Sequence, residues 1–356
     1  MNDSLIAVAM SGGVDSSLVA YELKNQGYKL FGITMKHLDL DEDEKEKSKT
    51  CCSLNDIYDS KKICNELGVN HYTINLKDPF KEKVINYFIN NYRIGNTPNP
   101  CIMCNKKIKL GELFNSAEQL GATHLATGHY AIIKDGKLYQ AVDEHKDQSY
   151  FLSQIDKKYL KKLIFPLGNL TKDLVREKSK IVKSRTADKE DSQGVCFIKN
   201  NDYKSFFEKV LSKEEKQKGE IVDLKGNFLG YHEGVHNYTI GQRKGIGISS
   251  SEAYYVLKVE PMNNRVIVGK DEEVFKNSLS CNNINLLIDE DINYLNNLKC
   301  FVKTRARDNK NEAVLKVKGK DEIYIEFEKG VRAITPGQVA VFYTEENQVL
   351  GSGIIL

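Results

Sequence analysis

The sequence lacks any run of about 18 apolar residues, and we therefore expect no membrane-spanning helix. It also leaves no room for a signal peptide, because the apolar residues 5–8 follow the first methionine almost directly. Without an export signal, the eight cysteines indicate a reducing compartment, where thiols perform chemistry or bind metal and seldom form structural bridges. These features predict a cytoplasmic protein that does not associate with a membrane.

Two signatures of nucleotide-binding proteins are missing as well. The chain contains neither the Gly-Lys-Ser/Thr sequence of P-loop proteins nor the GxGxxG pattern of dinucleotide-binding domains. It has one CxxC pair, at Cys101 and Cys104, and no second CxxC or CxxH. Since structural zinc needs four ligands, this pair alone does not predict a zinc site.

Positive charge is only slightly in excess, and a formal net charge of +3 is too small to indicate a nucleic-acid partner. Its distribution is uneven, however, because residues 157–185 contain many more basic than acidic side chains. Such a stretch can follow a phosphate backbone, whereas a lysine-rich helix face can equally be plain solvated surface. The sequence leaves both interpretations open.

The pattern of apolar residues changes between the two halves of the chain. In the first half, apolar runs at 5–8, 30–35, 72–76 and 124–127 alternate with stretches at helical spacing, which predicts a doubly wound parallel sheet. From about residue 219, short alternating runs separated by Gly, Asn and Asp predict one or two small antiparallel barrels. We therefore expect an α/β catalytic domain at 1–200, a central β-rich domain at 201–270 and a C-terminal β-barrel at 271–356.

The run Ala-Met-Ser-Gly-Gly-Val-Asp-Ser at 9–16 joins the first predicted strand to the first predicted helix. Gly12 and Gly13 allow the backbone N–H groups to form a concave turn, into which the helix directs its positive dipole end. Such a turn holds a polyanion such as the pyrophosphate of a nucleotide, and the Asp15 carboxylate can help to hold Mg²⁺. The string resembles the PP-loop of ATP pyrophosphatases, which cleave ATP between the α and β phosphates to adenylate an oxygen. We expect ATP to contact the whole turn: Ala9, Met10, Ser11, Gly12, Gly13, Val14, Asp15 and Ser16.

Three cysteines are candidates for chemistry. Cys101 and Cys104 stand at the predicted start of a helix, where backbone N–H groups and the helix dipole stabilise a thiolate. Cys196 follows Gly194, which indicates a tight loop. We expect the other thiols to be buried or incidental: Cys51, Cys52, Cys64, Cys281 and Cys300.

Further motifs follow the glycine turn in a fixed order. They are Thr-Pro-Asn-Pro at 97–100 with Cys104 and Asn105, Ala-Thr-Gly-His-Tyr at 126–130, Lys-Asp-Gln-Ser-Tyr-Phe-Leu at 146–152, Asp-Ser at 191–192 with Gly-Val-Cys-Phe-Ile at 194–198, Tyr-Thr-Ile-Gly-Gln-Arg-Lys-Gly-Ile-Gly at 238–247, Val-Lys-Thr-Arg at 302–305 and Thr-Pro-Gly-Gln at 335–338. With this set the chain resembles the tRNA-specific 2-thiouridylase (MnmA) family over nearly its full length. The resemblance implies a PP-loop domain of the adenine nucleotide α-hydrolase type, followed by the central domain and the barrel.

The resemblance also implies a reaction, the transfer of sulfur onto C2 of the wobble uridine, U34, in tRNA. ATP adenylates O2 and makes it a leaving group, while Met35 and Gly128 contact the adenosine. Sulfur from a cysteine desulfurase or a sulfur-relay protein rests on Cys196 as a persulfide and passes to C2 as AMP leaves. Cys104 is the nucleophile that forms a disulfide with Cys196, or that releases hydrogen sulfide to attack C2.

The substrates that the resemblance implies are the glutamate, glutamine and lysine tRNAs. The positions expected to touch the tRNA or its target base are Asn99, Pro100, Cys101, His129, Lys146, Asp147, Gln148, Arg305, Ala306 and Gln338. Simpler structural roles are open for several of them. His129 can be a hydrogen-bonded turn residue, Gln338 a polar residue after a turn, and the segments around Lys146 and Arg305 ordinary polar surface.

One position departs from some members of the family. Certain relatives carry Asp three positions before the residue that matches Cys104, and this chain has Cys101 there. A neutral thiol cannot act as that carboxylate would, so a general-base role does not carry over. Cys101, Cys104 and Cys196 could instead bind a [4Fe–4S] cluster whose open iron holds a sulfide for C2. The persulfide and cluster routes both stay open.

Other functions share parts of this pattern. Argininosuccinate, GMP, NAD and tRNA lysidine synthetases use the same phosphate turn, but they need no paired reactive thiols. A non-catalytic RNA-binding module would tolerate the loss of Asp15 and of the thiols. The same chemistry on a ribosomal RNA or on a different tRNA position would keep every motif, and this alternative stays open.

Overall fold

The computed structural model describes residues 4–38, 54–190 and 194–356, and the chain forms two units. The first unit consists of Met1–Ile85, Cys101–Asn200 and Asn347–Val349, and the second of Asn86–Pro100, Asn201–Glu346 and Leu350–Leu356. The chain therefore crosses between the units several times. Cys51, Cys52 and residues 191–193 lie outside the described residues.

A parallel sheet of five strands forms the centre of the first unit, in the order β3-β2-β1-β4-β7. The strands are β1 (Leu5–Ala9), β2 (Lys29–Lys36), β3 (His71–Asn75), β4 (His124–Ala126) and β7 (Leu163–Ile164). From β1 the chain builds outward first on one side and then on the other, which confirms the predicted doubly wound fold. Six of the eight residues of β2 are buried, as expected for an interior parallel strand.

Helices accompany this sheet. They are α1 (Val14–Asn25), α2 (Leu54–Glu66), α3 (Lys77–Phe80), α5 (Pro100–Met103), α6 (Phe114–Gln119), α7 (Ser149–Leu152) and α8 (Lys172–Ile181), with π-helical stretches at Lys81–Asn86 and Cys104–Leu113. Helix α8 begins where the Thr171 side chain accepts a hydrogen bond from the Leu174 N–H. Leu18 of α1 and Val175 of α8 are fully buried in one core cluster with Val8 of β1. This packing fixes α1 and α8 beside the end of β1. A small hairpin, β5 (Ile132–Lys134) and β6 (Lys137–Tyr139), completes the first unit.

The second unit contains a four-stranded sheet in the order β10-β11-β8-β9. Its strands are β8 (Gly219–Val222), β9 (Phe228–His232), β10 (Tyr255–Glu260) and β11 (Arg265–Gly269). Helices α4 (Tyr87–Arg93) and α9 (Tyr203–Val210) belong to the same unit. Their aromatic side chains pack together, since the Phe207 ring stacks on Phe88 at 5.9 Å between centroids and lies 4.6 Å from Tyr92. These rings give the two short helices a shared core.

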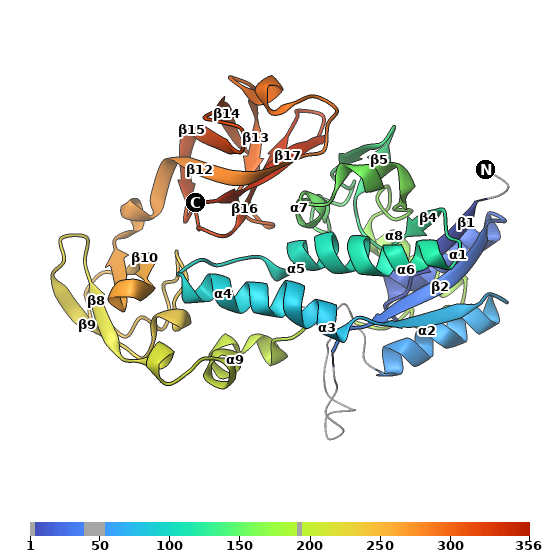
Figure 1. Ribbon diagram of the computed structural model, residues 1–356, viewed down its shortest axis with the longest axis horizontal. Coiled ribbons are helices and arrows are strands. Elements are labelled where there is room, and N and C mark those ends of the chain that lie inside the picture. Colours follow the sequence, from blue (N-terminus) through green and yellow to red (C-terminus); the bar gives the residue numbers. More distant parts are fainter. Residues whose placement is uncertain (1–3, 39–53, 191–193) are drawn as a thin grey trace. The chain divides into compact units, whose positions relative to one another are not determined.

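A closed barrel of six strands, orange to red in Figure 1, ends the chain in the order β12-β15-β14-β13-β16-β17. The strands are β12 (Phe275–Leu286), β13 (Lys299–Lys303), β14 (Asn311–Val317), β15 (Glu322–Arg332), β16 (Val339–Tyr343) and β17 (Val349–Ile355). Ile323, Ile325 and Phe327 of β15 lie in its core, while Glu328 is exposed. This alternation confirms the predicted C-terminal β-barrel.

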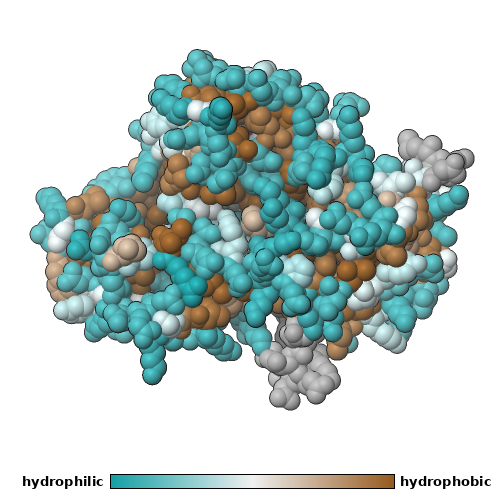
Figure 2. Space-filling model, in the orientation of Figure 1, coloured by the Kyte–Doolittle hydropathy of each residue, from teal (hydrophilic) through white to brown (hydrophobic). Residues whose placement is uncertain are grey.

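Hydrophobic side chains lie mostly inside these cores. The face drawn in Figure 2 is largely hydrophilic, with scattered hydrophobic patches, as is usual for folded proteins. Among the described residues, no helix combines the length and the apolar character needed to cross a membrane.

Basic side chains at 157–185 are partly engaged within the first unit. Lys162 pairs with Glu118, Lys178 with Glu22 and Arg185 with Glu66. These ion pairs favour the interpretation of this stretch as a solvated helix face over that of a continuous track for phosphates.

Candidate functional site

The glycine turn lies between the end of β1 and the start of α1 (Figure 1). Gly12 has φ +68°, and a Cβ at this position would lie 2.5 Å from the Asp56 backbone of α2, so only glycine fits. Gly13 is the N-cap of α1 and offers no capping side chain. The first amide groups of α1 are therefore not capped by their own N-cap residue and can bind an anion. The Ser16 hydroxyl accepts a hydrogen bond from the Ser11 N–H at 3.1 Å and holds the turn closed.

Asp15 connects this turn to two other segments. Lys172 Nζ donates to both carboxylate oxygens, at 2.7 and 2.9 Å, and the Tyr130 hydroxyl donates to one of them at 2.9 Å. Gly128 lies directly behind, because a Cβ there would be 3.0 Å from Asp15 Cβ and from Ser16 N. The segments at 9–16 and 126–130, which follow the carboxyl ends of β1 and β4, are thus in contact.

This pairing bears on the expected Mg²⁺ site. Lys172 covers both oxygens of Asp15, and no group of three His, Cys, Asp or Glu side chains among the described residues is arranged to hold a metal ion. The residues at the turn therefore do not form a preassembled Mg²⁺ site.

Lys189 supports the other side of the turn. Its Nζ donates to the Gly12 carbonyl oxygen at 2.9 Å and pairs with Asp56 and Asp59 of α2. Asp56 is buried, and the Gly12 backbone packs against it. The turn is therefore held between α2 and the segment that precedes Cys196.

Cys101 and Cys104 lie on one helical stretch but in different surroundings. Cys101 is an exposed residue of α5, whereas Cys104 is buried and begins the π-helix Cys104–Leu113. π-helical turns often occur at functional sites. Next to Cys104, the Asn105 Nδ2 donates to the Phe151 carbonyl oxygen at 3.0 Å, while Oδ1 is buried and accepts no hydrogen bond from the described residues. Asn105 thus presents an unused acceptor beside a candidate nucleophile.

Cys196 belongs to the same unit and is half-buried, after Gly194 with φ +80° as expected for a tight loop. Its thiol and those of Cys101 and Cys104 are not bonded in disulfides. In this conformation the three cysteines do not form a metal-binding group within the described ranges, so they do not fit the predicted [4Fe–4S] cluster.

Three of the other cysteines confirm the prediction that they are buried. Burial raises the pKa of Cys64 to about 11 and the pKa values of Cys281 and Cys300 to about 12. Their thiols stay protonated near neutral pH and are poor nucleophiles.

Several predicted tRNA-contacting residues of the first unit have structural partners. His129 is 7% exposed; its Nδ1 lies 2.7 Å from Thr127 Oγ1 and its Nε2 lies 3.4 Å from Lys109 Nζ. Burial, with a smaller effect from Lys109, holds the pKa of the His129 imidazole well below its usual value, so the ring is neutral at pH 7. The structure thus places His129 as a hydrogen-bonded turn residue.

Lys146, Asp147 and Gln148 are half-buried. Asp147 accepts hydrogen bonds from the Ala141 N–H at 3.0 Å and from the Ser149 hydroxyl at 2.8 Å. Gln148 Oε1 accepts from the Tyr130 N–H at 3.0 Å. Asp147 and Gln148 therefore hold the loop that positions Tyr130 against Asp15.

The other predicted tRNA-contacting residues belong to the second unit. Gln338 Nε2 donates to the Thr97 carbonyl oxygen at 2.6 Å, and the Thr97 N–H donates to the Pro336 carbonyl oxygen at 2.8 Å. The barrel loop at 335–338 thus fixes the segment that leads into Asn99 and Pro100. Those two residues are half-buried and buried, respectively.

Arg305 serves as a clamp within the second unit. Its Nη2 donates to the carbonyl oxygens of Ile240, at 3.2 Å, and Ala333, at 2.7 Å, and to Thr335 Oγ1 at 2.7 Å. This side chain joins the motif at 238–247 to the barrel. Ala306, the next residue, is half-buried.

The sequence motifs do not identify three residues of this site: Lys172, Lys189 and Tyr130. Tyr130 lies within a quoted motif and could have been found there, but Lys172 was one of many lysines in a basic stretch. Among the predicted ATP contacts, Met35 is a buried residue of β2, next to the strand that carries the turn. The ATP contacts of residues 9–16, Met35 and Gly128 stay predictions.

Family models match three consecutive stretches of the chain. They are described as tRNA methyl transferase HUP domain at residues 4–200, tRNA methyl transferase PRC-barrel domain at 204–270 and Aminomethyltransferase beta-barrel domain at 276–355.

Three similar proteins are named tRNA-specific 2-thiouridylase. The chain is 45% identical over 357 residues to tRNA-specific 2-thiouridylase MnmA 1 of Caldanaerobacter subterraneus, with 98% of this chain and 97% of that protein covered. It is 46% identical over 352 residues to MnmA 1 of Fusobacterium nucleatum, covering 98% and 92%. MnmA of Clostridioides difficile is 41% identical over 356 residues, covering 98% and 97%. With this similarity over nearly the whole length, the chain belongs to the tRNA-specific 2-thiouridylase (MnmA) family.

Proposed function

We propose that the chain is an ATP-dependent tRNA-uridine 2-sulfurtransferase that acts on the wobble uridine, U34. The observation that carries this proposal is the family membership over 98% of the chain, together with a glycine turn of the PP-loop type in the same unit as Cys104 and Cys196. The alternative substrates, a ribosomal RNA or another tRNA position, are outcomes of the experiment below.

The first step activates the uridine. Its O2 attacks the α-phosphorus of ATP, the bond to the β-phosphate oxygen breaks, and pyrophosphate leaves. The open amides at the start of α1 receive the phosphate charge, and Lys172 adds a cation beside them. Mg²⁺ bound to ATP would neutralise phosphate charge, and we assign it no ligand at the turn, because Lys172 occupies both oxygens of Asp15.

The second step brings the sulfur. The terminal sulfur of a Cys196 persulfide attacks C2 and AMP leaves, which joins Cys196 to the base through two sulfur atoms. The Cys104 thiolate then attacks the Cys196 sulfur, so the S–S bond breaks, 2-thiouridine is released and a Cys104–Cys196 disulfide forms. An external dithiol reductant restores both thiols. In the other variant of this route, the Cys104 thiolate attacks Cys196 Sγ of the persulfide first. The S–S bond to the outer sulfur breaks, a Cys104–Cys196 disulfide forms, and the hydrogen sulfide released attacks C2 as AMP leaves.

The supply of sulfur and the choice of tRNA belong to the same proposal. A cysteine desulfurase or a relay protein loads Cys196, the glutamate, glutamine and lysine tRNAs are the substrates, and the reaction takes place in the cytoplasm. We also propose that the chain divides into domains at 1–200, 201–270 and 271–356.

The test combines the purified chain with Mg-ATP, a cysteine desulfurase, cysteine and a lysine tRNA transcript. Thiolated tRNA is separated on a mercury-containing gel, and AMP is measured in the same samples. We expect retarded tRNA and AMP with the wild type, and no retarded tRNA with Cys196→Ser or Cys104→Ser. Cys196→Ser should also form no AMP, because no persulfide is present to displace it from C2.

Two further variants sharpen this test. Cys101→Ser distinguishes the two sulfur routes. The variant should still thiolate tRNA if sulfur is carried as a persulfide, and it should lose this activity if a cluster bound by three cysteines carries the sulfide. Cys300→Ser in the barrel is the matched control, and we expect full activity from it. Retardation by the Cys196→Ser variant would refute the proposed chemistry. A second gel examines total RNA from a deletion strain complemented with the gene. If only other RNAs are retarded there, the substrate is not U34 of tRNA.

A further inference from the structure

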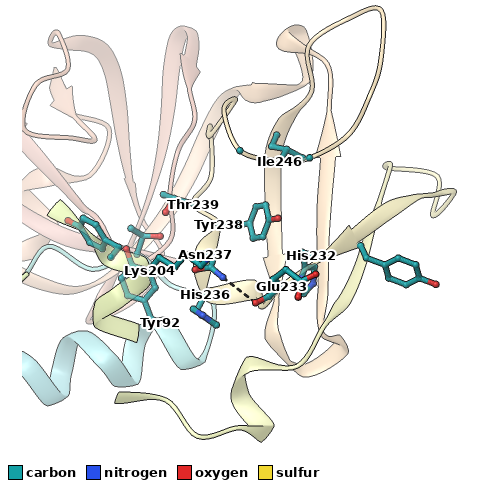
Figure 3. Close-up of a pocket in the computed structure, with 14 residues that line it drawn as sticks. Tyr92, Lys204, His232, Glu233, His236, Asn237, Tyr238, Thr239 and Ile246 are labelled. Carbon is teal, nitrogen blue, oxygen red and sulfur yellow. Dashed lines mark hydrogen bonds between the residues drawn. The ribbon is translucent and has the colours of Figure 1, made fainter. Parts of the chain in front are cut away.

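A pocket of about 620 Å³ lies in the second unit, and no residue assigned above to ATP or sulfur lines it. Figure 3 shows its wall, much of which comes from α4, α9, the end of β9 and the segment after it. Aromatic and imidazole rings make up much of the lining: Tyr92, Tyr203, Tyr231, His232, His236 and Tyr238. A pocket of this size and lining is typical of a site for a small planar group.

Two residues of the pocket lining, His236 and Asn237, have buried polar atoms without a hydrogen-bond partner among the described residues. His236 is 6% exposed, and neither of its ring nitrogens has a hydrogen-bond partner in the described part of the chain. The Asn237 Oδ1 beside it is buried and also lacks a donor, while its Nδ2 donates to the Glu233 carbonyl oxygen at 3.3 Å (Figure 3). A buried polar group without a partner costs roughly 1–3 kcal/mol, so such atoms gathered in one pocket point to a ligand.

The imidazole of His236 is held in this orientation. The Phe207 ring lies 5.7 Å away between centroids. Gly234 is in contact on another side, because a Cβ there would lie 2.4 Å from His236 Cε1. Burial lowers the pKa of His236, so at pH 7 the neutral ring offers one donor and one acceptor.

The surface next to the pocket carries exposed aromatic side chains and lysines. Tyr231 and Phe228 of β9 are 60% and 54% exposed, and their rings meet edge to face at 4.9 Å. Lys218 Nζ lies 4.8 Å from the centre of the Tyr231 ring, and Lys204 is exposed at the pocket. The carboxylate of Glu233 lies there too, 3.9 Å from Lys218. Exposed aromatic faces beside lysines are the features with which proteins bind unpaired bases.

From these observations we infer that the pocket binds an unpaired base of the substrate RNA, distinct from the uridine that reacts. The base stacks on the Tyr231 side of the pocket, and its edge exchanges hydrogen bonds with His236 and Asn237. The planar shape fits the ring-lined walls, and a base edge supplies both a donor and an acceptor. This inference rests on the proposed function, because it takes tRNA as the RNA that is bound.

The test measures binding of a fluorescently labelled lysine tRNA transcript to the full-length protein without ATP, at several salt concentrations. Loss of one stacked base costs about 1–3 kcal/mol, so Tyr231→Ala should weaken binding about fivefold or more. The slope of log K against log salt should not change, since no phosphate contact is removed. His236→Phe keeps a ring against Phe207 but removes the polar atoms, and should weaken binding in the same way.

Tyr58→Ala is the matched control. Tyr58 is 55% exposed and also lies under a lysine, with Lys62 Nζ 4.2 Å from its ring centre, but it belongs to α2 of the first unit. We expect wild-type affinity from it. Lys204→Ala should instead lower the salt slope by about one, which shows that the assay separates charge from stacking.

Unchanged affinity of both Tyr231→Ala and His236→Phe would overturn the inference, and so would a loss accompanied by a lower salt slope. Should His236→Phe unfold, the exposed Tyr231→Ala decides the question alone. The binding assay uses no chemistry, so a wild type that binds tRNA but thiolates none refutes the proposed function and leaves the pocket test intact. If all variants bind tRNA equally and the wild type thiolates it, the inferred base-binding role of the pocket is refuted and the proposed function is not.

Discussion

Lys172→Met tests the ion pair that ties α8 to the glycine turn. Lys172 Nζ contacts both Asp15 oxygens, and the two side chains are 9% and 30% exposed. Exposed ion pairs contribute about 0–1 kcal/mol, whereas removal of one partner from a fully buried pair costs about 3–5 kcal/mol. The exposure of this pair lies between the two cases. In the Lys172→Met variant, Asp15 still accepts a hydrogen bond from the Tyr130 hydroxyl. We therefore expect the free energy of unfolding to fall by about 2–3 kcal/mol.

Thermal unfolding of the ligand-free protein measures this loss. For a unit of this size, 1 kcal/mol corresponds to roughly 2–4 °C, so the first unit should melt about 4–12 °C lower. Lys178→Met is the matched control, because Lys178 pairs with Glu22 at 2.9 Å across the same two helices, but its side chain is 36% exposed. We expect this control to cost no more than about 1 kcal/mol.

A double-mutant cycle with Asp15→Asn completes the experiment. In the double variant the amide leaves no buried charge to compensate, so part of the stability should return. The coupling between Lys172 and Asp15 should be at least about 1 kcal/mol. Zero coupling, or equal losses from Lys172→Met and Lys178→Met, would show that the pair does not hold the turn.

Three further outcomes are expected. The folded-state pKa of His129 lies below its unfolded value of about 6.5, so its contribution to stability is present above that pH and is lost as the pH falls toward the folded pKa. The stability gap between wild type and His129→Gln in thermal melts should therefore narrow by up to about 1.4 kcal/mol per pH unit below 6.5, and a constant gap would contradict the assignment. Gly12→Ala should lower the free energy of unfolding by at least about 1–2 kcal/mol in a denaturant titration. Gly13→Ala should lower it much less, because Gly13 has φ −95° and no atom lies nearer than 3.6 Å to its added Cβ. Equal losses from the two variants would speak against the turn geometry. Gln338→Leu removes the hydrogen bond to the Thr97 carbonyl oxygen, which contributes about 1 kcal/mol. Hydrogen exchange at the Thr97 N–H should therefore become roughly fivefold faster. Unchanged exchange would show that the barrel loop does not fix this segment.

The glycine turn could be predicted because all its determinants are adjacent in the chain. An apolar strand, two glycines and the start of a helix follow one another, and local rules are sufficient. Lys172 could not be found in this way, because it lies 157 residues from Asp15 and resembles the solvated lysines around it. The alternation of apolar residues along strand β12 is likewise hard to recognise, because serines and asparagines interrupt it.

The roles of the predicted tRNA contacts depend on which other segments fold beside them. Arg305 looks like a surface arginine in the sequence, yet its guanidinium donates to Ile240 and Ala333, which come from separate stretches. Similarly, nothing next to His236 in the sequence indicates that it is buried against Phe207. Local pattern predicts the element that carries such a residue, while its partners come from tertiary packing.

The aromatic cluster of α4 and α9 has a consequence for synthesis on the ribosome. Phe88 emerges about 120 residues before Phe207, the ring on which it stacks. At roughly 5–20 residues per second, the nascent chain carries this helix without its partner for about 6–24 s. During that time its rings are available to chaperones or to neighbouring nascent chains, so slower elongation before residue 207 should lower the soluble yield.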